Sequence, residues 1–68
     1  MSIQLKLNGE PRELPDGARL AQAVAELTAA PRGVAAAVNG DVVPRGSWAA
    51  TPLRDGDQVE VVTAVQGG

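Results

Sequence analysis

The stretch that decides the fold closes the chain and reads Gln58-Val59-Glu60-Val61-Val62-Thr63-Ala64-Val65-Gln66-Gly67-Gly68. Its valines and its alternation are typical of a β-strand with one buried face. We expect Val59 and Val61 to face the core, and Val62 and Ala64 to lie on the opposite face. Glycine ends the regular structure, so the sequence predicts a domain over residues 1–65 and a flexible tail over residues 66–68 that ends in a free carboxylate.

A second apolar strand begins the chain. Residues 2–7 alternate strictly, and Ile3, Leu5 and Leu7 share one face. Asn8-Gly9 follows and is a strong hairpin signal, because a type I′ turn needs positive φ at both central positions. The return strand over residues 10–14 contains Pro11, which favours an edge position because proline cannot donate to a ladder. We therefore expect the first and last strands to form the centre of the sheet.

The middle of the chain changes to a helical period. Apolar residues recur at i, i+3, i+4 and i+7, namely Leu20, Ala23, Val24 and Leu27. This spacing predicts one helix over residues 20–29. Arg19 stands at the N-cap position, where a short hydroxylic or acidic side chain is usual, and Pro31 and Gly33 end the element.

A second hairpin follows the helix. Residues 34–38 are short and lead into the turn Asn39-Gly40, which favours a strand and a return strand over residues 41–44, with Pro44 again marking an edge. The alanines indicate tight packing on one face. We expect residues 45–50 to form a short loop with one helical turn, capped by Ser47, and residues 53–57 to form a reversal. The sequence thus predicts an α+β fold, a mixed sheet of four to five strands with one main helix on one face.

Composition excludes several classes of function. The 68 residues form one domain, and they contain no Cys and no His, which removes the commonest metal ligands and the commonest general base. The net charge is −2 with scattered arginines, so we expect no nucleic-acid partner. The chain has no apolar run long enough to span a bilayer and no leader pattern, so we expect a cytoplasmic protein without a membrane partner.

Few side chains are candidates for catalysis. Asp55 and Asp57 flank Gly56, a pattern more typical of a solvated turn than of an acid/base pair. Trp48 is expected to cover the core, with a partner contact as the alternative. We therefore expect no catalytic side chain, no bound cofactor and no metal site.

The carboxylate of Gly68 remains as the reactive group. A terminal carboxylate is ionised at neutral pH, because its ordinary pKa is about 3.3–3.7. Such a group can attack the α-phosphorus of ATP, and the resulting acyl-adenylate can be captured by sulfur or by an amine. Glycines at 67 and 68 let the tail pass a narrow channel and leave the carbonyl unshielded. Ordering a tail residue costs roughly 1–2 kcal/mol, so the folded body must supply docking affinity, and we expect Val62 and Ala64 to contribute to it.

The whole chain resembles the ThiS family of ubiquitin-like sulfur carriers. The resemblance rests on the combination of Asn8-Gly9-Glu10, Leu14-Pro15-Asp16-Gly17, residues 38–45, Trp48, Leu53-Arg54-Asp55-Gly56-Asp57 and residues 61–68. Arg19 departs from the small hydroxylic residue expected before the helix. The resemblance implies a ubiquitin-like β-grasp fold and a role in thiamine biosynthesis.

The resemblance also implies partners. An E1-like enzyme of the ThiF type would use ATP to adenylate Gly68, and a relay from a cysteine desulfurase would convert it to a thiocarboxylate. Thiazole synthase of the ThiG type would take the sulfur into the thiazole phosphate ring. Val65, Gln66, Gly67 and Gly68 would thread into the partners' active sites, and the carrier itself would catalyse nothing.

Other functions remain open on the sequence. The small subunit of molybdopterin synthase also ends in Gly-Gly, although that family is usually longer and richer in Phe, which this chain lacks. A carrier for cysteine synthesis and a ubiquitin-like tagging module share the same tail chemistry. The last alternative is a structural domain whose Gly-Gly end has no function.

Overall fold

Two hairpins supply four of the five strands of a single sheet. The computed structural model describes residues 1–27 and 33–63, with Thr63 described for its backbone alone. In chain order the elements are β1 (Ser2–Leu7), β2 (Glu10–Pro15), α1 (Leu20–Leu27), β3 (Val34–Val38), β4 (Asp41–Val43), the 3-10 helix η1 (Arg45–Ala50) and β5 (Gln58–Thr63). Both predicted turns form, with Asn8 at φ 55° and Asn39 at φ 52°, so the local turn chemistry sets both hairpins.

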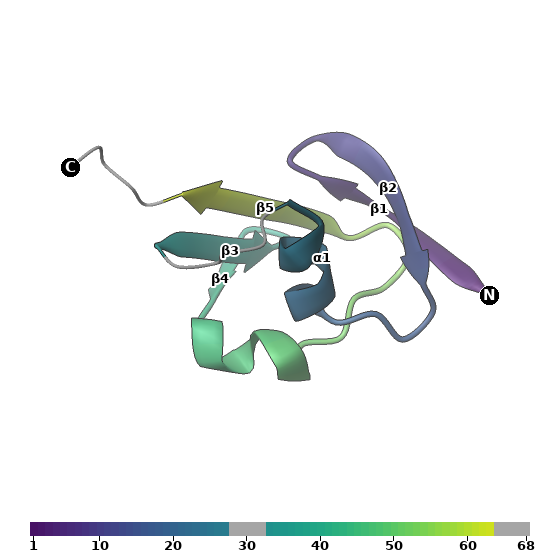
Figure 1. Ribbon diagram of the computed structural model, residues 1–68. Coiled ribbons are helices and arrows are strands. Elements are labelled where there is room, and N and C mark those ends of the chain that lie inside the picture. Colours follow the sequence, from purple (N-terminus) through teal and green to yellow (C-terminus); the bar gives the residue numbers. More distant parts are fainter. Residues whose placement is uncertain (28–32, 64–68) are drawn as a thin grey trace.

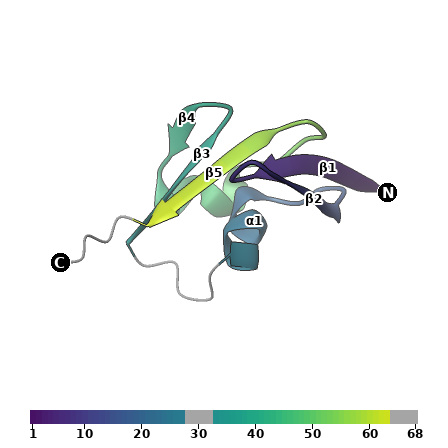
Figure 2. The same ribbon diagram turned by 90° about the horizontal axis from the view of Figure 1, so that it is seen from above.

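The last strand lies at the centre of the sheet. The strand order is β2-β1-β5-β3-β4, as Figures 1 and 2 show. β5 runs parallel to β1 and antiparallel to β3. The outer positions of β2 and β4 agree with the prediction from Pro11, within β2, and Pro44, directly after β4. The predicted α+β architecture with a mixed sheet is confirmed.

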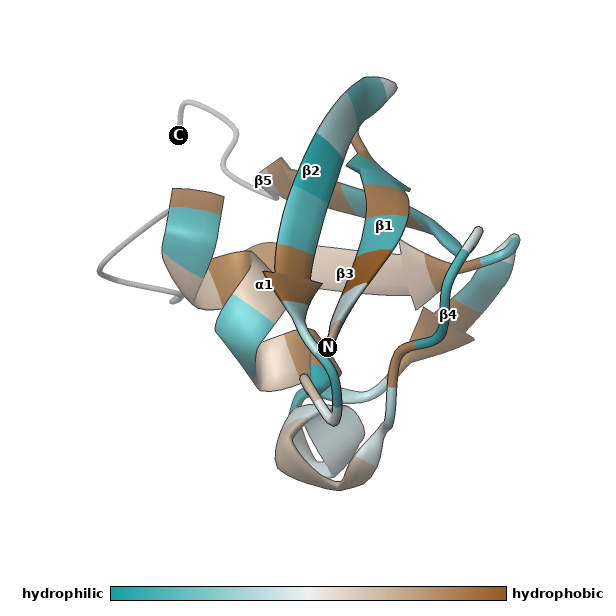
Figure 3. Cartoon of the chain, turned by 90° about the vertical axis from the view of Figure 1, so that its right-hand side faces the viewer, coloured by the Kyte–Doolittle hydropathy of each residue, from teal (hydrophilic) through white to brown (hydrophobic). Residues whose placement is uncertain are grey.

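One face of the sheet carries the core. Alternate side chains of β1 and β5 point to this face, where α1 and η1 cover them, and Figure 3 shows the matching hydrophobic and hydrophilic bands along β1 and β2. The buried residues are Ile3, Leu5, Leu7, Leu14, Ala18, Leu20, Ala23, Val24, Ala36, Trp48, Leu53, Val59 and Val61. Within the described ranges, no helix is long and apolar enough to cross a membrane.

The helix begins at the predicted residue. Gln22 reaches back from the third helical position and accepts a hydrogen bond from the backbone N–H of Arg19 at 3.2 Å. This contact is the glutamine half of a capping box, and it replaces the cap that Arg19 does not provide. α1 extends to Leu27 in the described part, and the predicted continuation to residue 29 lies outside it.

The prediction that Ser47 caps the helical turn is wrong. Pro44 occupies the N-cap position of η1 without a side-chain hydrogen bond, because η1 begins two residues before the serine. The Ser47 carbonyl instead accepts a hydrogen bond from the hydroxyl of Thr51 at 2.6 Å. Trp48 is buried in the core, where its indole N–H donates to the carbonyl of Val43 at 2.9 Å and ties η1 to β4.

Candidate functional site

The candidate site begins where β5 ends. Val59 and Val61 are buried, as the alternation predicts, and Val62 is exposed on the opposite face. In Figures 1 and 2 the arrowhead of β5 lies on the opposite side of the molecule from the N-terminus. β5 is therefore anchored in the core by its inward side chains. The other predicted site residues, Ala64, Val65, Gln66, Gly67 and Gly68, lie outside the described residues.

An apolar patch lies on the sheet face that the helices leave open. Val62 on β5 is paired with Ala35 on β3, and Val42 on β4 is paired with Ala37 on β3. Directly opposed residues of antiparallel strands share a face, so these four side chains form one surface, here called the outer apolar patch. Val42 is 75% exposed and Val62 is 59% exposed.

The outer apolar patch is hollowed at its centre. The short side chains of β3 stand between the longer ones of β4 and β5, which leaves a depression of about 210 Å³. Its lining also includes the exposed Glu60. This volume is below the roughly 300–1,000 Å³ of small-molecule sites, so the depression suits an apolar side chain of a partner better than a cofactor.

The two aspartates of the turn before β5 have structural roles. Asp55 accepts a hydrogen bond from the backbone N–H of Gln4 at 2.7 Å, which joins the turn to β1. Asp57 accepts from the backbone N–H of Arg54 at 2.8 Å and from the side-chain amide of Asn39 at 3.0 Å. The two carboxylates therefore hold the start of β5 against both neighbouring hairpins. This structural role differs from both interpretations of the sequence, which were a solvated turn and an acid/base pair.

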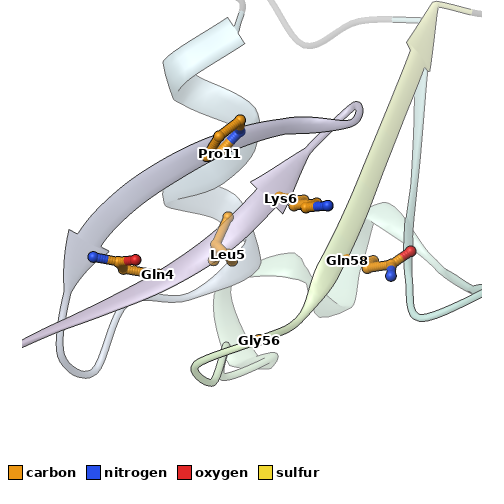
Figure 4. A pocket seen from close by; sticks show the side chains of 6 residues that line it. All are labelled: Gln4, Leu5, Lys6, Pro11, Gly56 and Gln58. Carbon is orange, nitrogen blue, oxygen red and sulfur yellow. The ribbon is translucent and has the colours of Figure 1, made fainter.

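A second depression of about 220 Å³ lies at the polar end of the sheet. It is lined by Gln4, Leu5 and Lys6 of β1 together with Pro11, Gly56 and Gln58 (Figure 4). It is also smaller than an ordinary ligand pocket. The described residues contain no group of three Asp or Glu side chains close enough to hold a metal ion.

Sequence reasoning found Val62 but missed the rest of the outer apolar patch. The alanines of β3 were expected to pack tightly on one face, yet only Ala36 is buried, whereas Ala35 is exposed and Ala37 half-buried. A signal was present, because the two-residue Asn-Gly turn fixes the pairing of Val42 with Ala37. Counting outward from that turn would have placed both residues on one face.

Comparison with known proteins identifies relatives along nearly the whole chain. The model of the ThiS family matches residues 5–68. The chain is 44% identical over 62 residues to the sulfur carrier protein ThiS of Thermus thermophilus, an alignment that covers 91% of this chain and 95% of that protein. It is also similar to a solved structure of ThiS from Geobacter metallireducens, with a TM-score of 0.80 and 29% identity over 97% of this chain and 100% of that one. The ubiquitin-like β-grasp fold is therefore confirmed.

A longer relative shares the same domain. The chain is 39% identical over 66 residues to a thiazole synthase of Magnetococcus marinus. The alignment covers 97% of this chain and only 20% of that protein. A domain of this kind thus occurs as one part of a protein named for thiazole synthesis.

Proposed function

This chain belongs to the ThiS family, and we propose that it carries sulfur for thiamine biosynthesis on the carboxylate of Gly68. The position of β5 is the observation that carries the proposal. β5 is the central strand of the sheet, and in sequence it precedes the glycines at positions 67 and 68, while its exposed side chain Val62 belongs to the outer apolar patch. A rigid body with an apolar surface on its central strand fits a protein whose C-terminal residues are modified by other enzymes.

The proposed chemistry modifies the terminal carboxyl group of Gly68. A carboxylate oxygen of Gly68 attacks the α-phosphorus of ATP in the site of an E1-like enzyme, and pyrophosphate leaves. The outer sulfur of a persulfide, supplied by a relay from a cysteine desulfurase, then attacks the carbonyl carbon, and AMP leaves with the former carboxylate oxygen. A second thiol cleaves the S–S bond of the resulting acyl disulfide; the relay thiol and this second thiol end as a disulfide, and the thiocarboxylate remains on Gly68. The chain contributes the reacting carboxylate and binds neither ATP nor metal, so it is a co-substrate and not an enzyme.

Thiazole synthase is the proposed acceptor of the sulfur. The Magnetococcus marinus protein of that name contains a domain similar to this chain. Joining a carrier to its acceptor raises their effective concentration and favours their encounter. A carrier that is not joined to its acceptor needs a docking surface to reach the same proximity. Because every step uses ATP-dependent or cysteine-derived chemistry, we expect the protein to work in the cytoplasm.

The outer apolar patch is the proposed docking surface. Residues 65–68 must enter a partner's active site, and Ala64, predicted to share the face of Val62, would extend the patch toward them. In the free protein, the apolar side chains of Val42 and Val62 are largely exposed to water, so their burial by a partner would favour binding. The patch lies on the sheet face opposite α1, so docking leaves the core packing unchanged.

Mass spectrometry of the intact protein tests the proposal. After co-expression with its activating enzyme, the chain should show the mass increase produced by replacing one oxygen with sulfur, confined to the C-terminal peptide. A variant without Gly68 should keep the unfolding midpoint of the natural chain and gain no sulfur. Absence of the thiocarboxylate in the natural chain, with an active enzyme present, would refute the carrier function.

A deletion strain separates the related pathways. Loss of a thiazole-directed carrier should produce a requirement for thiazole that the natural chain relieves and the chain without Gly68 does not. A deficiency of molybdenum cofactor instead would assign the protein to molybdopterin synthesis, and a cysteine requirement would assign it to cysteine synthesis.

A further inference from the structure

Two asparagines in equivalent turns both hold the central strand. Asn8 and Asn39 each occupy the first central position of an Asn-Gly hairpin turn with positive φ. Both side chains reach across to the backbone of β5, one near each end of the strand. The turns themselves need only a residue that tolerates positive φ, and glycine meets that need as well as asparagine. The turns therefore do not account for the contacts that these two side chains make with β5.

Asn8 extends the parallel ladder between β1 and β5 beyond the end of β1. The backbone pairing of these strands reaches only to Leu7 and Val59. The Asn8 backbone N–H then donates to the carbonyl of Val59 at 2.8 Å. Its side-chain oxygen accepts from the N–H of Val61 at 2.8 Å, and its side-chain nitrogen donates to the carbonyl of Val61 at 3.0 Å. A carboxamide carries the same donor and acceptor as a peptide group, so the side chain takes the place of the next residue of β1.

Val61 is consequently fixed from three directions. Its side chain is buried in the core, β3 pairs with it through Ala36, and Asn8 binds both of its backbone polar groups on the other side. β5 ends two residues later, at Thr63. The Asn8 contact thus holds β5 close to its last residue. We infer that Asn8 is a positioning residue that aims the C-terminal tail; the inference rests on the proposed function.

Asn39 offers a matched control at the other end of the same strand. Its side-chain oxygen accepts from the N–H of Gln58 at 3.0 Å, and its backbone N–H donates to the carbonyl of Gln58 at 2.8 Å. Its side-chain nitrogen donates to Asp57. Asn39 thus has the same turn, the same side chain and the same target strand as Asn8, but it acts where β5 begins.

The variants Asn8→Gly and Asn39→Gly compare the asparagine contacts at the two ends of β5. Each substitution keeps its turn and removes two side-chain hydrogen bonds near β5. Amide hydrogen exchange at Val61 reports the Asn8 contact directly, because the acceptor of that N–H is the Asn8 side chain. We expect faster exchange at Val61 in Asn8→Gly and unchanged exchange there in Asn39→Gly.

Steady-state adenylation by the activating enzyme supplies the functional readout, at a temperature where both variants are folded. Misplacing a reacting group by about 1 Å can cost up to about 100-fold in rate, so we expect Asn8→Gly to lower kcat at least tenfold. Neither substitution changes the proposed docking surface, so KM of both variants should stay within about twofold of the natural value. The kcat of Asn39→Gly should also stay within about twofold of the natural value.

The outcomes distinguish this inference from the proposed function. Unchanged exchange at Val61 in Asn8→Gly, or equal losses of kcat in the two variants, would overturn the positioning role of Asn8. Loss of adenylation in the natural chain would overturn the proposed function instead, whatever the exchange data show. A loss expressed in KM alone would place Asn8 in docking and would also overturn the inference.

Discussion

The double substitution Val42→Thr and Val62→Thr should weaken binding of the carrier to its activating enzyme. Threonine has the shape of valine and a similar preference for strands, so β4 and β5 should keep their geometry. Both valines are mostly exposed in the free protein. Substitutions at such surface positions usually change the free energy of unfolding by less than about 0.5 kcal/mol. The change therefore acts on docking and not on folding.

The exposed fractions set the size of the effect. Complete burial of a valine side chain is worth about 1.5 kcal/mol. With 75% of Val42 and 59% of Val62 exposed before docking, full coverage by a partner would contribute about 1.1 and 0.9 kcal/mol. In the threonine variant the cost of desolvating the hydroxyl offsets the gain from the remaining methyl. The loss of about 2 kcal/mol corresponds to a dissociation constant about 30-fold larger.

Titration calorimetry of the carrier with the activating enzyme measures this change. Leu27→Gln is the control, because Leu27 is 38% exposed and lies on the helix that covers the opposite face of the sheet. Its dissociation constant should stay within about twofold of the natural value, since the predicted interface does not include it. A double variant that binds within about threefold of the natural chain would refute the docking role of the patch, as would an equal loss in the Leu27 variant.

Three further predictions concern the fold that carries the tail. Leu20→Ala should lower the free energy of unfolding by about 2–5 kcal/mol, because Leu20 is fully buried. Urea unfolding followed by Trp48 fluorescence measures this free energy, and a loss below about 1 kcal/mol would contradict the packing of Leu20. Gly40→Ala should cost about 1–2 kcal/mol, since φ is +87° and the added Cβ would meet no atom within 4 Å; a larger cost in the same assay would indicate a clash. Asp57→Ala should cost about 1–3 kcal/mol by removing two accepted hydrogen bonds, and the folded fraction should gain sulfur at the natural rate. A slower rate would give Asp57 a role in the reaction.

The hairpins and the alternation were predictable because their signals are local. Asn-Gly turns fix register within two residues, and period-two patterns assign Val59 and Val61 to the core. Prolines identified the edge strands by a similarly local rule, the missing N–H donor. Ser47 shows the limit of that reasoning. Its hydroxyl is a good cap in isolation, but a 3-10 helix that begins directly after Pro44 leaves it inside the element.

The contacts that hold β5 were not predictable from local pattern. Asn8 and Val61 are 53 residues apart, and the turn signal explains the asparagine completely without them. Asp55 likewise contacts Gln4 across 51 residues. Such contacts depend on the strand order, which a sequence pattern limits but does not specify. The Gly68 carboxylate stays a prediction, made because a chain without Cys and His leaves few other groups able to react.

The central position of β5 joins the two tasks of the chain. Side chains alternate along a strand, so the same six residues bury Val59 and Val61 and expose Val62 on the opposite face. A shift of one residue in the pairing of β5 would exchange these faces, placing Val62 in the core and core valines on the outer apolar patch. Contacts that fix this register, including the side-chain bonds of Asn8 and Asn39, therefore protect stability and partner docking together. Selection for either property alone would favour the same contacts, which explains why the carrier needs a sheet with a fixed register.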